Sequence, residues 1–143
     1  MQNYMKLELA ALSENESFAR SAVAAFALPL SPSFSDLSDI KTAVSEAVTN
    51  CIVHAYKGGE GKIVIECRIE KSARGGILHI DVTDYGCGIE DVEAAILPFF
   101  TTLEGDERSG MGFTVMQTFS TFFKVESEIG KGTRVTMQKA VGM

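Results

Sequence analysis

The side chains best suited to chemistry lie in four short motifs that follow one another along the chain. The motifs are residues 46–54, 84–89, 108–113 and 130–133. The first supplies a carboxylate, an amide and an imidazole from Glu46, Asn50 and His54. The other three are rich in glycine, which admits positive φ and lets the backbone approach a ligand closely. One such motif is weak support, but four within one domain's length predict a nucleotide-binding site.

Glu46, Asn50 and His54 are spaced four residues apart, so on a helix they form one row. This row borders a predicted apolar face, where packing can hold a side chain that still reaches a pocket. A solvated helix edge is the alternative for such a pair of Glu and Asn, and the glycine motifs favour the site. His54 is expected to be a hydrogen-bonded helix residue rather than a catalyst.

Asp84 ends an apolar strand, where its carboxylate can accept a hydrogen bond from an exocyclic amine such as that of adenine. Gly86 and Gly88 follow it and allow backbone to approach the ligand. A tight turn is the alternative for this motif alone. Thr133, after the turn at residues 130–132, adds a hydroxyl that could support the Asp84 carboxylate.

Gly110 and Gly112 open a predicted helix, whose free N–H groups and dipole favour phosphate. Arg108 precedes them and can reach a terminal phosphate. A surface charge in an acidic loop is an equally good interpretation of Arg108, since Glu104 and Asp106 lie nearby.

Composition points to one globular domain over residues 1–143, with 45% hydrophobic and 22% charged residues. The net charge of −6 argues against nonspecific binding to nucleic acid or to an anionic membrane. No apolar run approaches the roughly 20 residues of a membrane span, and the first residues do not resemble a signal peptide. The three cysteines lack metal-ligand spacing, and an odd count without a secretion signal is typical of reduced thiols in a cytoplasm.

Periodicity predicts an α+β protein, a two-layer sandwich of one mixed sheet with helices on one face. A first helix is expected over residues 14–28, opened by a capping box of Ser13 and Glu16. A second helix, capped by Ser35 or Asp36, is expected to continue to about Tyr56. The remaining expected elements are strands at 5–9, 63–65, 77–82, 124–128 and 133–139, and helices at 90–96 and 110–121.

The four motifs resemble the N box and the three glycine boxes of the GHKL ATPase/kinase superfamily. Residues 45–50, 100–102 and 107–113 carry a closer resemblance, to the anti-sigma-F factors of spore-forming bacteria, a family of small serine kinases. Residues 15–20 also fit that family.

The resemblance implies a Bergerat-type ATP-binding fold that uses ATP or ADP and Mg²⁺. It implies that Glu46 is the general base, that Asn50 ligates Mg²⁺ and that Asp84 reads adenine, with residues 98–109 as an ATP lid. The residues it assigns to ATP binding are Asn50, His54, Asp84, Gly86, Gly88, Ile89, Thr101, Thr102, Arg108, Ser109, Gly110, Met111, Gly112, Phe113 and Thr133.

The resemblance also implies a cytoplasmic homodimer that blocks a sporulation sigma factor and phosphorylates a serine of an anti-anti-sigma protein. It places Arg20 in partner contact, and it implies neither direct nucleic acid binding nor a membrane. Two alternatives stay open: a related kinase of a stress-response partner switch, and a non-catalytic ATP-binding module that only sequesters a partner. The catalytic domain of a histidine kinase fits less well, because neither His54 nor His79 lies on a dimerising helical hairpin.

Overall fold

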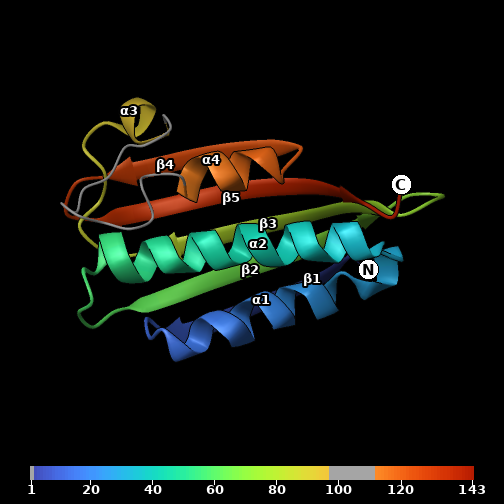
Figure 1. Cartoon of the computed structure of the whole chain (residues 1–143), viewed down its shortest axis with the longest axis horizontal. Helices are drawn as coiled ribbons and strands as arrows, with labels where there is room; N and C mark the ends of the chain where they lie inside the picture. Colours follow the sequence, from blue (N-terminus) through green and yellow to red (C-terminus); the bar gives the residue numbers. More distant parts are fainter. Residues whose placement is uncertain (1, 97–111) are drawn as a thin grey trace.

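The computed structural model describes residues 2–96 and 112–143. Its elements, in chain order, are β1 (Asn3–Ala10), α1 (Glu14–Phe26), the 3₁₀ turn η1 (Leu28–Leu30), α2 (Phe34–Asn50), the π-helical turn η2 (Cys51–Ala55), β2 (Lys62–Lys71), β3 (Gly76–Asp84), α3 (Val92–Ile96), α4 (Gly112–Thr118), β4 (Phe122–Glu128) and β5 (Gly132–Val141). Figure 1 shows α1, α2 and α4 lying across one face of the sheet. The predicted α+β class and two-layer arrangement are therefore confirmed.

The five strands are ordered β1-β2-β3-β5-β4, and every neighbouring pair is antiparallel. The prediction of a mixed sheet was wrong. A parallel pair needs one crossover that returns the chain to the same end of the sheet. Here two helices, α1 and α2, lie between β1 and β2. The chain therefore enters β2 at the end of the sheet where β1 finishes, and the two strands are antiparallel (Figure 1).

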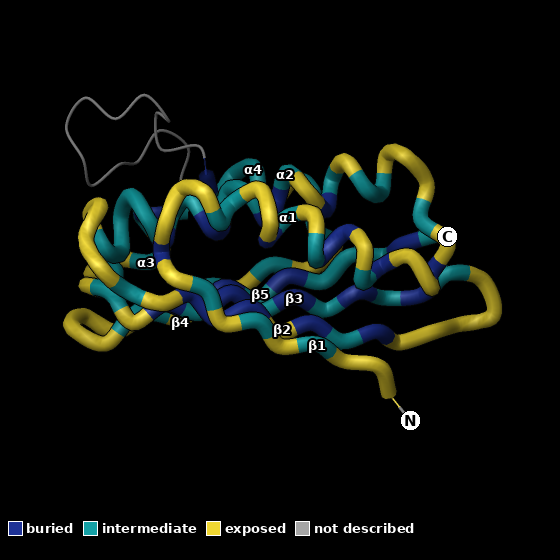
Figure 2. Tube along the Cα trace, turned by 90° about the horizontal axis from the view of Figure 1, so that it is seen from below, coloured by how far each residue is buried: buried dark blue, intermediate teal, exposed yellow. Residues whose placement is uncertain are grey.

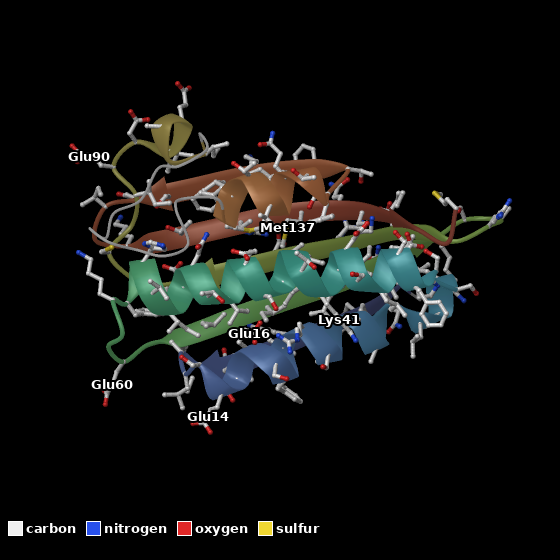
Figure 3. All side chains as sticks on the ribbon, in the orientation of Figure 1. Glu14, Glu16, Lys41, Glu60, Glu90 and Met137 are labelled. Carbon is white, nitrogen blue, oxygen red and sulfur yellow. The ribbon has the colours of Figure 1, made fainter. Side chains whose placement is uncertain are left out.

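The core lies between the two layers, where the buried segments gather in Figure 2. Alternation along β3 turns Leu78, Ile80 and Val82 toward the helices, and Met137 on β5 joins them with 1% exposure (Figure 3). The other face of the sheet is polar. Its cross-strand ion pair between Arg134 and Asp81 has an N–O distance of 2.8 Å.

Helix α1 begins at Glu14, as predicted, but its C-terminal end and its cap differ from the prediction. It ends at Phe26 instead of residue 28, because Pro29 lies in the separate turn η1. The capping box predicted from Ser13 and Glu16 does not form: Ser13 has helical backbone angles, and its side chain makes no capping hydrogen bond. Glu16 instead faces α2 (Figure 3), where it bonds the hydroxyl of Ser45.

Helix α2 has its N-cap two or three residues earlier than the predicted Ser35 or Asp36. Ser33 is the N-cap, and it forms a reciprocal capping box with Asp36 at 3.0 and 3.1 Å. The predicted apolar face is buried, as at Val44 and Val48. The helix reaches Tyr56 as expected, but its last turn, η2, is π-helical.

Strands β1, β3, β4 and β5 extend their predictions by one or two residues at an end, whereas β2, predicted over residues 63–65, runs from Lys62 to Lys71. The helix expected at residues 90–96 is the shorter α3, and the helix expected at 110–121 is described only as α4. Within residues 2–96 and 112–143, no helix has the length and apolar character needed to cross a membrane.

Candidate functional site

Glu46 and Asn50 lie one turn apart on α2, and both are half-buried beside its apolar face. Their neighbours Ala47 and Val48 are almost fully buried, so packing fixes this part of the helix. The row of three polar side chains does not continue with α-helical spacing to His54. That residue lies in the π turn η2, where the Tyr56 N–H donates to the carbonyl five residues back, on Cys51, at 3.0 Å.

Asn50 lies against the first residue of α4. A Cβ built on Gly112 would stand 2.9 Å from Asn50 Oδ1 and 3.0 Å from its Nδ2. Two residues predicted for the site from distant motifs are thus in contact. Phe113, next on α4, packs on Phe123 of β4 with ring centroids 6.1 Å apart, which anchors the start of the helix.

Asp84 is a buried carboxylate at the end of β3, with 6% exposure. Its Oδ1 accepts the Gly86 N–H at 3.0 Å. Burial raises the pKa of the Asp84 carboxyl, and hydrogen bonds from the Gly86 N–H, the Cys51 thiol and the Thr133 N–H counter part of that rise. Burial beside Asp84 also raises the pKa of Cys51, which keeps its thiol protonated. The site therefore holds a desolvated acceptor surrounded by donors.

The loop after Asp84 has no room for side chains at its two glycines. A Cβ on Gly86 would stand 2.4 Å from the Ala55 carbonyl oxygen. Gly88 has φ +76°, and a Cβ there would stand 2.2 Å from the carbonyl oxygen of Glu128. The glycine pattern thus marks a loop packed directly on the backbone of η2 and of the β4–β5 turn.

Hydrogen bonds to backbone and to one side chain hold the same loop. The Cys87 N–H donates to the Ala55 carbonyl at 3.0 Å, and the Cys87 carbonyl accepts the Gly130 N–H at 2.8 Å. The Ile89 N–H donates to the Ser127 hydroxyl at 2.8 Å. The second and fourth motifs of the sequence therefore meet at this end of the sheet.

Ser127 is a site residue that the sequence reasoning missed. Its hydroxyl lies 2.8 Å from the hydroxyl of Thr133 and 3.0 Å from the Gly132 carbonyl. Thr133 is buried, with 8% exposure. The alternation of β4 carried a usable signal, because Ser127 occupies the inward face that it shares with Phe123 and Val125.

Arg20, predicted to contact a partner, lies on α1 and is 39% exposed at its side chain. It donates to both carboxylate oxygens of Glu16 at 2.8 and 2.9 Å, and its Nη1 lies 3.4 Å from the Ser45 hydroxyl. The cluster joins α1 to the turn of α2 that carries Glu46.

Six predicted ATP-binding residues and the predicted lid lie outside the described residues. The six are Thr101, Thr102, Arg108, Ser109, Gly110 and Met111. All three cysteines are free thiols, and of these only Cys87, beside the His54 carbonyl, is exposed.

Comparison with known proteins identifies an ATPase domain, which agrees with the predicted nucleotide site. Residues 9–139 match the histidine kinase-like ATPase domain. The anti-sigma F factor of Thermoanaerobacter sp. (strain X514) is 54% identical over 140 residues, which cover 98% of this chain and 95% of that protein. The anti-sigma F factor of Clostridium kluyveri is 51% identical over 137 residues, which cover 96% of this chain and 94% of that protein.

Two solved structures share the fold at low identity. The RsbU and RsbW domains of Rv1364c from Mycobacterium tuberculosis align with a TM-score of 0.66 at 18% identity, over 97% of this chain and 32% of that one. The mycobacterial sensor histidine kinase MprB aligns with a TM-score of 0.55 at 17% identity, over 96% and 98%. On the domain match and the near full-length relatives, this chain belongs to the histidine kinase-like ATPase domain family and, within it, to the anti-sigma F factors.

Proposed function

We propose that this protein is an ATP-dependent protein serine kinase that is also an anti-sigma factor. As a homodimer of single-domain chains, it binds and inhibits a sporulation sigma factor. It transfers the γ-phosphoryl group of ATP to a serine of an anti-anti-sigma partner, with Mg²⁺ as the metal. Its membership of the anti-sigma F factors supports both activities.

One observation carries the proposal: the end of α2 and the turn η2 contact two predicted halves of a nucleotide site. Asn50 meets Gly112 at the start of α4. Five residues later, the carbonyl of Ala55 accepts the N–H of Cys87 in the loop that follows Asp84. A ligand with a base at Asp84 and phosphates near Asn50 would span these two contacts.

The residues present fit Mg·ATP. Asn50 offers a side-chain oxygen, which suits Mg²⁺, and Gly112 lies so close to this amide that only a residue without a side chain leaves it in place. Asp84 offers a buried acceptor for an exocyclic amine. When bound, Mg·ATP supplies the phosphoryl group and neutralises its developing charge, so the protein's work is mainly positioning. Glu46, one helical turn from Asn50, orients and deprotonates the partner's serine hydroxyl.

The half-exposed Arg20 supports partner binding on α1. Its guanidinium is held by Glu16, so it is already oriented when a partner arrives. An acidic side chain of the sigma factor or of the anti-anti-sigma protein would pair with it, and rim charges of this kind act mainly on the association rate. The same cluster includes Ser45, which directly precedes Glu46 on α2.

The test is a kinase assay with γ-phosphate-labelled ATP, Mg²⁺ and an anti-anti-sigma protein, with and without its acceptor serine. We expect label on the partner that disappears when the serine is replaced. Glu46→Gln should retain ATP binding and lose transfer roughly 10²- to 10⁴-fold. Glu66→Gln, on the exposed polar face of β2, is the matched control and should transfer normally.

The other outcomes identify the alternatives. Label on this chain itself would favour a histidine kinase. ATP binding without transfer to any partner would favour a module that only sequesters. Unchanged transfer by Glu46→Gln would refute the general-base role.

A further inference from the structure

Tyr56 connects three segments near the candidate base site through one hydroxyl group. The hydroxyl accepts the Tyr85 N–H at 2.7 Å and donates to the Lys62 carbonyl at 2.5 Å. Tyr56 itself follows η2, Lys62 begins β2, and Tyr85 follows Asp84 directly. Burial raises the pKa of Tyr56, so the hydroxyl keeps the proton that it donates.

The local sequence is arranged to place this ring. The i→i+5 hydrogen bond of the π turn, from the Tyr56 N–H to the Cys51 carbonyl, rotates Tyr56 out of α-helical register. A Cβ built on Gly61 would stand 2.3 Å from the Tyr56 ring, so only glycine leaves room for it there. The π turn and the glycine are separate features that serve the same side chain.

The bond to Tyr85 acts on the peptide group that Asp84 shares with Tyr85. Rotation of that peptide would move the Gly86 N–H, which donates to Asp84 Oδ1 at 3.0 Å. Lys62 adds a second restraint, since its ammonium lies 5.3 Å from the centre of the Tyr85 ring. The orientation of the Asp84 carboxylate therefore depends on the hydrogen bond from the Tyr85 N–H to the Tyr56 hydroxyl, which comes from outside the Asp84 loop.

We propose that Tyr56 is a positioning residue for base recognition: its hydroxyl fixes the Asp84–Tyr85 peptide, so that the Asp84 carboxylate is held in one orientation toward the exocyclic amine of adenine. The inference rests on the proposed nucleotide site. Tyr56 acts through Asp84, and the consequence is selectivity for the base rather than phosphoryl transfer.

Tyr56→Phe tests this, because phenylalanine keeps the ring beside Gly61 and loses only the hydroxyl. Titration calorimetry should show the Kd for ATP rising roughly 3- to 10-fold, which corresponds to one neutral hydrogen bond, and the Kd for GTP changing less than about twofold. The ATP preference should therefore fall. Tyr4→Phe, at an exposed position of β1, is the matched control and should leave both constants unchanged.

A double-mutant cycle separates positioning from a general structural effect. In an Asp84→Asn background, Tyr56→Phe should no longer change the ratio of the two Kd values, because the residue through which it acts is gone. Amide hydrogen exchange at Tyr85 should be faster in Tyr56→Phe, whether or not nucleotide is present.

Failure of this inference can be told apart from failure of the proposed function. Equal losses for ATP and GTP, or an unchanged preference in Tyr56→Phe, would overturn the inference while the kinase stands. A wild-type protein that binds neither nucleotide would overturn the inference together with the proposed function.

Discussion

Gly112 lies against Asn50 so closely that a Cβ on the glycine would stand 2.9 Å from the amide oxygen of the asparagine. A Gly112→Ala variant should still fold, because alanine favours a helix over glycine by up to about 1 kcal/mol. Its methyl group should displace the Asn50 side chain, because a side-chain end yields more easily than backbone. We expect the Mg²⁺-dependent affinity for ATP to fall roughly tenfold or more.

Titration of ATP with and without Mg²⁺ measures this effect, and thermal unfolding measures stability. Gln117→Ala is the control, because it lies on the exposed side of the same helix. If Gly112→Ala bound Mg·ATP as tightly as the wild-type protein does, Asn50 would not be the residue that holds the metal.

Asp84→Asn should separate stability from selectivity. Burial raises the pKa of Asp84 above its ordinary value of 3.8, so the ionised form costs folding free energy. The stabilising contribution of the Asp84 carboxyl is complete below pH 3.8. It is lost as the pH rises through the raised pKa and the group ionises. The neutral asparagine should thus give the nucleotide-free protein an equal or larger free energy of unfolding at pH 7.

The same substitution should lower the preference for ATP over GTP roughly 10- to 100-fold, because it removes a charged acceptor. Urea unfolding at several pH values and binding of both nucleotides measure the two effects. Asp81→Asn, on the opposite face of β3, is the control for selectivity. An unchanged nucleotide preference in Asp84→Asn would reject the adenine-reading role.

The parts of the fold that depend on side-chain periodicity were predictable from the sequence. Alternation marked β3, and spacing of three and four residues marked the buried face of α2 around Val44 and Val48. The glycines after Asp84 were expected to let backbone approach a ligand, whereas the structure packs Gly86 against the carbonyl oxygen of Ala55.

What the sequence did not reveal depends on tertiary contacts. The π turn has no residue signature, although it determines where Tyr56 points. Both Ser13 and Ser33 precede an acidic residue by three positions, but only Ser33 adopts the extended backbone that a cap requires. The contact between Glu16 and Ser45 needs two helices to be packed before it can be recognised.

Ser127→Ala should loosen the contact between the Asp84 loop and β4. It leaves the Ile89 N–H without its acceptor and the Thr133 hydroxyl without its partner. We expect the free energy of unfolding to fall by about 1–3 kcal/mol, measured by urea denaturation. Ser127→Thr keeps the hydroxyl and should recover most of the loss. Equal losses in both variants would show that packing, and not the hydrogen bonds, stabilises this position.

Asp36 should make the fold acid-sensitive. Although partial burial opposes the shift, hydrogen bonds from the Gly142 N–H and from Ser33 hold the pKa of Asp36 below its ordinary value of 3.8. Because the folded pKa is the lower one, its stabilising contribution is present above 3.8 and is lost as the pH falls through the folded value. Asp36 joins the start of α2 to the end of β5, since its Oδ2 accepts the Gly142 N–H at 2.9 Å.

Asp36→Ala should therefore lower the free energy of unfolding by about 1–2 kcal/mol at pH 7, the usual cost of a lost helix cap. The difference from the wild-type protein should stay constant down to about pH 5 and then shrink as the wild-type carboxyl takes up its proton. Urea denaturation at intervals from pH 7 to pH 3 measures both. Ser35→Ala, exposed in the same first turn, is the control and should show no such convergence. A difference between Asp36→Ala and the wild-type protein that persists undiminished at pH 3 would mean that the side chain acts by packing rather than by its charge.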